Sequence, residues 1–211
     1  MTIHIEQEIK LTAANEPILE KIRLSKCVQD VLLDKKDAFE PKTFAAIYYD
    51  TPNWTLRDLR WSLRTRTEGT RHMAALKRGN DIINGLSSCE EIEQAITESF
   101  TSVGALPQGD IAQALQAELP KSTPLLSNIR TTMQRCKGIL QISDTRIEMV
   151  TDAGHIEGNG QQQSLFEVEL ELLQGDLQAK PVQLFVANLI QQFSLTPSKV
   201  SKHQIGLAFF T

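Results

Sequence analysis

Residues 3–11 read IHIEQEIKL, a stretch that alternates between apolar and charged side chains. Successive side chains of a β-strand point to opposite faces, so a strand here has one apolar and one charged face. The apolar face holds Ile3, Ile5, Ile9 and Leu11, and the charged face holds Glu6, Glu8 and Lys10. The stretch therefore predicts a strand whose polar face carries two acids and a base.

Two later stretches repeat this division, but the charges of each have one sign. Residues 166–172 read FEVELEL and residues 63–67 read LRTRT. The charged face holds Glu167, Glu169 and Glu171 in the first stretch, and Arg64 and Arg66 in the second. A solvated face usually mixes acids, bases and hydroxyls. The grouping of acids on some strands and bases on others therefore suggests a polar interior built around an ion.

Length and composition allow one large domain or two small ones. The chain has 211 residues, of which 41% are hydrophobic, and this is enough to build a core. We find no linker or internal repeat and expect a single domain over residues 1–211. No stretch approaches the roughly 18 apolar residues of a transmembrane helix, and the N-terminal residues contain no export signal.

Charge and cysteine content limit the function classes. The net charge of −4 and the pI near 5.6 argue against a general nucleic-acid or membrane-surface binder. Three cysteines lie far apart without CxxC spacing, which is typical of free thiols in a reducing cytosol. The four histidines show no metal-ligand spacing and are interpreted as ordinary. We expect a cytoplasmic protein.

Periodicity predicts a mainly β chain with a few helices. The expected strands after the first are residues 42–50, 61–67, 71–77, 89–96, 127–136, 139–142, 146–151 and 165–173. Turns are expected at residues 143–145 and again from Asp152 to Gly154. Helices are expected from Asn15 as N-cap through the apolar residues up to Leu32, near residues 111–119, and from Asp176 as cap to about Phe193.

The pattern leaves two architectures open. If the helices cover the apolar face, an open antiparallel sheet leaves the charged face in water, whereas a closed barrel makes it the lumen. Solvated faces are the commonest reason for alternation, and alternation by itself does not close a barrel. The separation of acids and bases onto different strands is the observation that favours the barrel.

The order of the charged motifs is similar to that of the CYTH superfamily, the triphosphate tunnel metalloenzymes. The resemblance extends from residue 3 to about residue 206, and we expect the chain to be closest to the bacterial inorganic triphosphatase branch. The matching motifs are Glu6-x-Glu8-x-Lys10, residues 48–52 (YYDTP), residues 63–66 (LRTR), Leu76-Lys77, Glu91-x-Glu93, Arg130, Ile147-Glu148, Asp152-x-Gly154, residues 166–171 (FEVELE), and Ser201-Lys202 before Gly206.

This resemblance implies a closed eight-stranded antiparallel β-barrel, a tunnel that binds Mg²⁺ or Mn²⁺ and a small-molecule triphosphate. The expected metal ligands are Glu6, Glu8, Glu148, Asp152, Glu167 and Glu169. The expected substrate-binding residues are Lys10, Arg64, Arg66, Lys77, Arg130 and Lys202. The expected catalytic residues are Glu6, Glu8, Lys10 and Glu169. Carboxylates suit hard cations, and guanidinium forks suit phosphate oxygens. No nucleic-acid or membrane partner is expected, and a homodimer is left open.

Several other residues are assigned to packing or solvent. Tyr48, Tyr49, Trp54 and Trp61 are interpreted as packing residues, and Lys199 and His203 as ordinary. Two positions depart from the related bacterial triphosphatases: Cys89 stands where they have an arginine, and Thr132 where they usually have a lysine. We therefore expect the basic wall of the tunnel to carry fewer charges.

Three functions remain open. The first is metal-dependent hydrolysis of inorganic triphosphate, and the second is a class IV adenylate cyclase or thiamine triphosphatase activity. The sequence contains no feature for adenine or thiazole recognition, which weighs against the second. The third is a polyphosphate-binding protein that has lost catalysis through an impaired tunnel.

Overall fold

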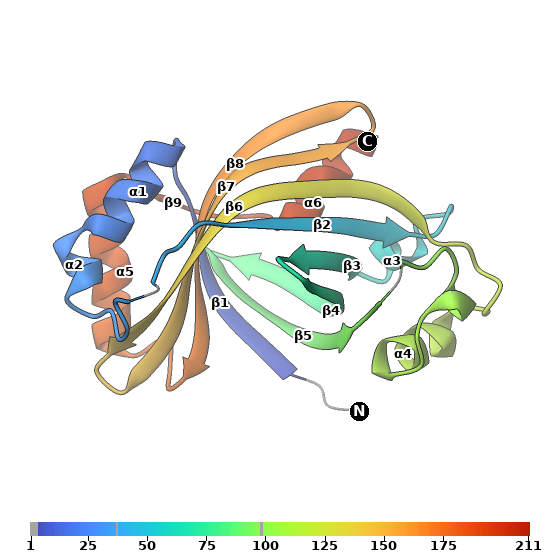
Figure 1. Ribbon diagram of the computed structural model, residues 1–211, viewed down its shortest axis with the longest axis horizontal. Helices are drawn as coiled ribbons and strands as arrows, with labels where there is room; N and C mark the ends of the chain where they lie inside the picture. Colours follow the sequence, from blue (N-terminus) through green and yellow to red (C-terminus); the bar gives the residue numbers. More distant parts are fainter. Residues whose placement is uncertain (1–3, 37, 98) are drawn as a thin grey trace.

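The computed structural model describes residues 4–36, 38–97 and 99–211. Ile3, the first residue of the opening stretch, lies outside these ranges. Eight long strands form one antiparallel sheet whose order is β5-β4-β3-β2-β6-β7-β8-β1, and β1 also pairs with β5. The sheet therefore closes into a barrel (Figure 1). The strands are β1 His4–Thr12, β2 Lys42–Asp50, β3 Trp61–Glu68, β4 Arg71–Ile83, β5 Leu86–Ala95, β6 Leu126–Ile142, β7 Thr145–Gly158 and β8 Gln161–Gln174.

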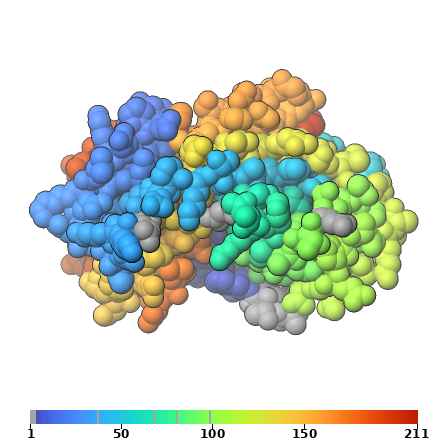
Figure 2. Space-filling view, viewed as in Figure 1, coloured from blue at the N-terminus to red at the C-terminus, as the bar shows by residue number. Residues whose placement is uncertain are grey.

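Helices cover the outside of the barrel at two places. Figure 1 shows α1 (Glu16–Leu24), α2 (Lys26–Gln29) and α5 (Lys180–Phe193) together at one end, where they pack on apolar residues of β1, β6, β7 and β8. The helix α4 (Asp110–Glu118) and the 3₁₀ turn η1 (Val103–Ala105) pack on β3, β4 and β5. Figure 2 shows these two groups at opposite ends of the molecule's long axis.

The remaining elements are short. The helix α3 (Thr55–Asp58) follows β2, and the two-residue strand β9 (Thr196–Pro197) pairs with β1. The helix α6 (Lys202–Leu207) and the 3₁₀ turn η2 (Ala208–Phe210) end the chain. Ser201 caps α6, because its hydroxyl accepts a hydrogen bond from the Gln204 amide while the Gln204 side chain accepts one from the Ser201 amide. This capping box fixes where Lys202 enters the fold.

Both faces of β1 are buried next to the helices. Ile9 and Leu11 pack in the core under α1 and α5, while Glu6, Glu8 and Lys10 are only 6%, 4% and 6% exposed. An open sheet would leave these three charges in water. The prediction of a closed barrel with covering helices is therefore confirmed.

The inner face of the barrel changes character along its length. Around β2, β6 and β7 it is apolar, and Ile129, Met133 and Ile156 pack there with Phe209 of η2. Further along β6, from Arg135, the inner face becomes charged, and the outer face becomes apolar under the helices at Leu140. The division into charged and apolar faces thus reverses within one strand.

This reversal explains two wrong predictions about the strands. Residues 136–139 do not interrupt the sheet, because β6 runs unbroken from Leu126 to Ile142. Asp152–Gly154 is not a turn but lies within β7, which turns back only after Gly158. Gly154 serves the close approach of β6, since a Cβ there would lie 2.0 Å from the Thr132 carbonyl oxygen. A glycine in a strand can mark such an approach as well as a turn.

The helix predictions are largely confirmed. Asn15 is the N-cap of α1, although Ser25 divides the expected long helix into α1 and α2. Asp176 does not cap α5, which begins after Ala179; its carboxylate instead accepts a hydrogen bond from the Gln178 amide. The three cysteines are free, as expected. Within the described part of the chain, no helix has the length and apolar character needed to span a membrane.

Candidate functional site

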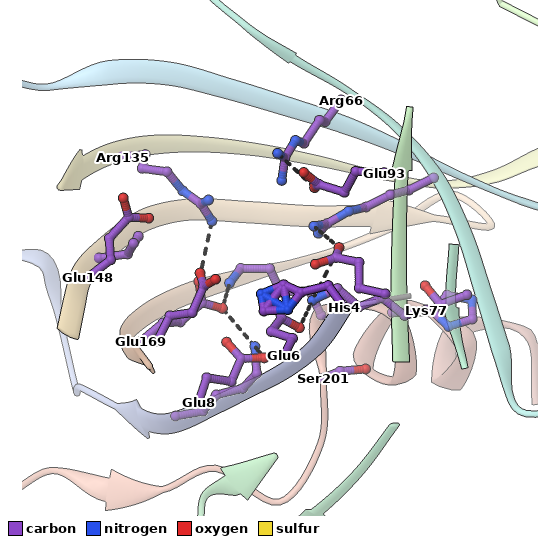
Figure 3. Close-up of a pocket in the computed structure, with 18 of the residues that line it drawn as sticks. His4, Glu6, Glu8, Arg66, Lys77, Glu93, Arg135, Glu148, Glu169 and Ser201 are labelled. Carbon is purple, nitrogen blue, oxygen red and sulfur yellow. Dashed lines mark hydrogen bonds and ion pairs between the residues drawn. The ribbon is translucent and has the colours of Figure 1, made fainter. Parts of the chain in front are cut away.

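A cavity of about 400 Å³ lies inside the charged part of the barrel. Seven acids and seven bases of the described chain line it, so charges of the two signs are balanced. The acids are Glu6, Glu8, Glu91, Glu93, Glu148, Glu169 and Glu171, and the bases are Lys10, Arg64, Arg66, Lys77, Arg135, Lys137 and Lys202. Figure 3 shows side chains from several strands converging on this space. Acids and bases that lie on separate strands in the sequence thus pair with one another across strands in the barrel.

One part of the wall is a compact ionic network. Lys202 of α6 lies 3.0 Å from Asp152 and 2.7 Å from Glu169, and it also contacts Glu167. Arg135 donates two hydrogen bonds to Asp152, at 2.7 and 2.5 Å. Lys10 donates one to Glu169 at 2.8 Å. These contacts join β1, β6, β7, β8 and α6.

The network sets the protonation of its members. Burial would favour neutral carboxyls. Arg135 and Lys202 nevertheless hold the pKa of Asp152 below its ordinary value. Lys10, followed by Lys202 and Arg135, likewise holds the pKa of Glu169 well below its ordinary value. Although burial disfavours charged amines, Glu167 and Glu169 raise the pKa of Lys202 above its ordinary value. Burial raises the pKa of Glu167. Asp152 and Glu167 do not line the cavity, so their partners are cations of the network.

A second group of acids is arranged differently. Glu171 of β8 lies directly opposite Glu8 of β1 on one side and Glu148 of β7 on the other. Burial, followed by the charges of Glu6, Glu148 and Glu8, raises the pKa of Glu171 to about 7. Adjacent carboxylates that repel one another and face a cavity are the donor set expected of a site for a hard divalent cation. Glu8, Glu148 and Glu171 fit such an ion.

Asp152, Glu167 and Glu169 also bring their oxygens within 4.8 Å of one another. Lys202 contacts all three of these carboxylates, and Arg135 holds both oxygens of Asp152. A divalent ion among them would have to displace these cations. The row formed by Glu8, Glu148 and Glu171 is less occupied, since Glu8 contacts Lys10 at 3.0 Å and Glu148 contacts Lys137 at 3.3 Å. It is therefore the better candidate, with Glu6 and Glu169 beside it in the cavity wall.

The opposite wall carries bases. Arg66 pairs with Glu93 at 2.8 Å (Figure 3), and Lys77 contacts Glu6. Arg64 is 3.7 Å from Glu91, and its Nε has no hydrogen-bond partner among the described residues. Although burial lowers it, Tyr48 and Glu91 raise the pKa of Arg64 above its ordinary value. A half-buried guanidinium whose buried Nε has no partner is suited to bind an anion.

Most of the predicted site residues meet in this cavity. The cavity wall contains Glu6, Glu8, Lys10, Arg64, Arg66, Lys77, Glu148, Glu169 and Lys202, while Asp152 and Glu167 lie behind it. Arg130 is the exception: it is exposed on the outer face and lines a separate pocket with Glu157. The prediction that Arg130 faces the tunnel is wrong, because inward-facing residues of β6 have odd numbers.

Arg135 and Lys137 take the place expected of Arg130 and of a lysine two residues later. Both line the cavity, and Lys137 lies 3.3 Å from Glu148. Thr132 is exposed and removes no charge from the lumen. The sequence signal for these two residues was the spacing Arg135-x-Lys137. It was missed because the strand was expected to end at Cys136. Of the two positions expected to lower the positive charge of the basic wall, only Cys89 lies where it can do so.

Three uncharged residues are also part of the site. His203 of α6 stacks on Tyr48, with ring centroids 5.2 Å apart, and both residues line the cavity. Burial, followed by the charge of Arg64, lowers the pKa of His203 to about 4 and keeps it neutral. The thiol of Cys89 donates a hydrogen bond to Glu6, and burial raises the pKa of this thiol to about 12. Treating Tyr48 and His203 as unrelated to the site overlooked their place in its wall.

Comparison with known proteins identifies related sequences. Residues 4–186 match the CYTH domain family. The chain is 28% identical over 174 residues to an inorganic triphosphatase from Haemophilus influenzae, a match that covers 82% of this chain and 47% of that protein. The chain thus spans about half the length of this curated relative.

Solved structures share the fold at lower sequence identity. A protein from Hippeastrum, described as an adenylyl cyclase candidate with a dominant triphosphatase activity, aligns with a TM-score of 0.69 and 16% identity over 96% of this chain and 95% of that one. A protein from Bacillus halodurans, described as an adenylate cyclase candidate, aligns with a TM-score of 0.61 and 17% identity over 95% and 96%. These alignments support the barrel fold alone.

Replacement of Asp152 tests its structural role. Asp152→Asn removes the buried carboxylate that Arg135 and Lys202 contact at 2.5 and 3.0 Å and leaves Glu169 as the acid they share, so the free energy of unfolding should fall by about 3–5 kcal/mol. Glu148→Gln, at the partly exposed end of the row, should change it by less than about 1 kcal/mol. Urea unfolding of the metal-free proteins measures both changes. Equal effects of the two substitutions would contradict this division of roles.

The pKa of Glu171 predicts a pH-dependent stability. In the folded protein it is raised to about 7 from 4.5, so between these values the folded state binds more protons than the unfolded state. The free energy of unfolding of the metal-free protein should therefore fall as the pH rises from 5 to 7. Glu171→Gln should remove this part of the dependence. Parallel pH profiles of the wild type and the variant, measured by urea unfolding, would be evidence against it.

Proposed function

Because this chain belongs to the CYTH family, we propose that it hydrolyses inorganic triphosphate in the barrel cavity with the help of Mg²⁺ or Mn²⁺. The observation that carries the proposal is the division of one buried cavity into a carboxylate row and a basic wall. Glu8, Glu148 and Glu171 form the row, and Arg64 and Arg66 belong to the basic wall. A polyanion bound with divalent cations would preserve the charge balance of the lining, whereas either one alone would disturb it.

The carboxylate row is the proposed metal site. Oxygen ligands from Glu8, Glu148 and Glu171, with Glu6 and Glu169 nearby, suit a hard cation that keeps several waters. When bound, such an ion neutralises phosphate charge and lowers the pKa of a coordinated water. The ion would thereby reduce the repulsion between the phosphates and these carboxylates, at the side of the cavity where Glu171 stands between Glu8 and Glu148.

The basic wall would hold and orient the phosphate chain. The unpaired Nε of Arg64 supports a direct contact with phosphate oxygens, since a guanidinium can bind two of them at once. Lys77 and Lys202 are held by acids and contribute positive charge at fixed positions. The stacked pair of Tyr48 and His203 limits the space beside Arg64. These residues would thus fix the position and orientation of the phosphate chain before the reaction.

The inorganic substrate is supported by the relative from Haemophilus influenzae and by the polar cavity lining. Apolar lining is limited to Val150 and Leu173 among the described residues, apart from the aromatic rings of Tyr48 and the histidines. We further propose that residues 1–211 act as one domain, because Lys202 of α6 completes the network of β7 and β8. The free cysteines support a cytoplasmic location.

Phosphate release tests the proposed reaction directly. Wild-type protein should release phosphate from inorganic triphosphate with Mg²⁺ or Mn²⁺, and much more slowly from ATP or thiamine triphosphate. Glu6→Gln should lower kcat by at least about 100-fold, a typical effect of removing one charge-stabilising group. Glu90→Gln is the matched control, because Glu90 pairs with Arg78 at 3.0 Å outside the cavity lining.

Other outcomes of the same assay would contradict the proposal. Formation of cyclic AMP from ATP would indicate a cyclase, and preferred turnover of thiamine triphosphate would indicate a different substrate. Triphosphate binding without turnover under either metal would indicate a binding protein. Equal losses in Glu6→Gln and Glu90→Gln would show that the reaction does not take place in the cavity.

A second prediction compares the two arginines of β6. Arg135→Lys keeps the charge but loses the fork that holds Asp152, so kcat/KM for triphosphate should fall by about 10-fold. Arg130→Lys, on the outer face, should leave kcat/KM unchanged. Steady-state kinetics with saturating metal measure both effects, and thermal unfolding checks that the variants are folded. The opposite ranking would restore Arg130 as the tunnel arginine.

A further inference from the structure

Cys89 lies where the two sides of the site meet. It stands on β5 directly opposite Glu6 of β1, and it is 4% exposed. Its Sγ donates a hydrogen bond to Oε2 of Glu6 at 3.3 Å. The Nζ of Lys77 contacts the same oxygen. Both donors therefore engage Oε2, and neither contact engages Oε1.

Cys89 lies beside an irregularity in the wall of the barrel. Pairing between β4 and β5 shifts from Arg78–Glu90 to Asp81–Ser88, so the two residues of β4 between Arg78 and Asp81 form a bulge opposite Cys89. Behind this irregularity lies an outer groove of about 510 Å³, which Cys89 lines together with Ile5, Trp61 and Arg78. The side chain of Cys89 thus lies between this groove and the carboxylate of Glu6.

The thiol differs from the other donors of the site in having no charge. A second cation beside Glu6 would hold the carboxylate in an ion pair and repel a divalent ion. A neutral donor can fix the orientation of the carboxylate without this repulsion. Lys77 already provides one positive charge at Oε2.

We propose that Cys89 is a positioning residue that orients the Glu6 carboxylate so that Oε1 is available to the divalent ion. This inference rests on the proposed metal-dependent function. The thiol acts through Glu6 and does not itself bind the ion. Its removal should weaken metal binding more than triphosphate binding, because Lys77 and the basic wall remain in place. A residue that only fills space would change stability but not the affinity for metal.

Direct Mn²⁺ binding to the metal-free protein, followed by electron paramagnetic resonance, tests this inference without any turnover. Cys89→Ala should raise the dissociation constant for Mn²⁺ by about 3- to 10-fold, the range for one net hydrogen bond. Cys89→Ser retains a small neutral donor and should stay within about 2-fold of the wild type, a smaller change than loss of that bond. In activity assays at saturating metal, KM for triphosphate should be unchanged in both variants.

Cys136→Ala is the matched control. Cys136 is also buried and free, but it pairs with Thr151, which accepts a hydrogen bond from Arg23 of α1 on the outer face. This variant should bind Mn²⁺ like the wild type. Unchanged Mn²⁺ affinity in Cys89→Ala, or equal weakening in Cys89→Ala and Cys89→Ser, would overturn the role of the thiol. Failure of the wild type to bind Mn²⁺ would instead overturn the proposed function, and this inference with it.

Discussion

Charged side chains can fill the inside of a barrel only when acids and bases reach one another across strands, because an unpaired buried charge is strongly unfavourable. In this protein Lys10, Arg135 and Lys202 meet that requirement for Asp152, Glu167 and Glu169. The residues of this network come from four strands and from α6. Closure of the sheet, the course of the C-terminal segment and the position of the cavity all depend on it.

The row of Glu8, Glu148 and Glu171 is where this compensation is incomplete. Three carboxylates stand side by side on paired strands, and burial, followed by the charges of Glu6, Glu148 and Glu8, raises the pKa of Glu171. Folded proteins retain such repulsion mainly at functional sites. In the proposed function, a divalent cation would relieve this repulsion and prepare the same surface for a phosphate chain.

Much of the fold could be predicted from local patterns. Alternation in residues 3–11 and 166–172 depends only on the period of a strand, and Asn15 as a helix cap depends only on hydrogen bonding within one turn. Arg130 could not be excluded in this way. The lumen beside Ile129 and Met133 is filled by η2, so the apolar side of β6 faces inward there and outward further along. Counting faces from one end of the strand therefore selects the wrong arginine.

The sequence by itself determined which side chains share a strand face, because that relation spans only two residues, and it determined that acids and bases lie on separate strands. The tertiary structure decided that the sheet closes and which carboxylates are neutralised. Glu169 and Glu171 are two positions apart on one strand face, yet Glu169 contacts Lys10 and Lys202 while Glu171 faces Glu8 and Glu148. The contact between Lys10 and Glu169 joins residues 159 positions apart. Only the register of the closed barrel brings such partners together, and this register distinguishes the structural acids from the candidate metal ligands.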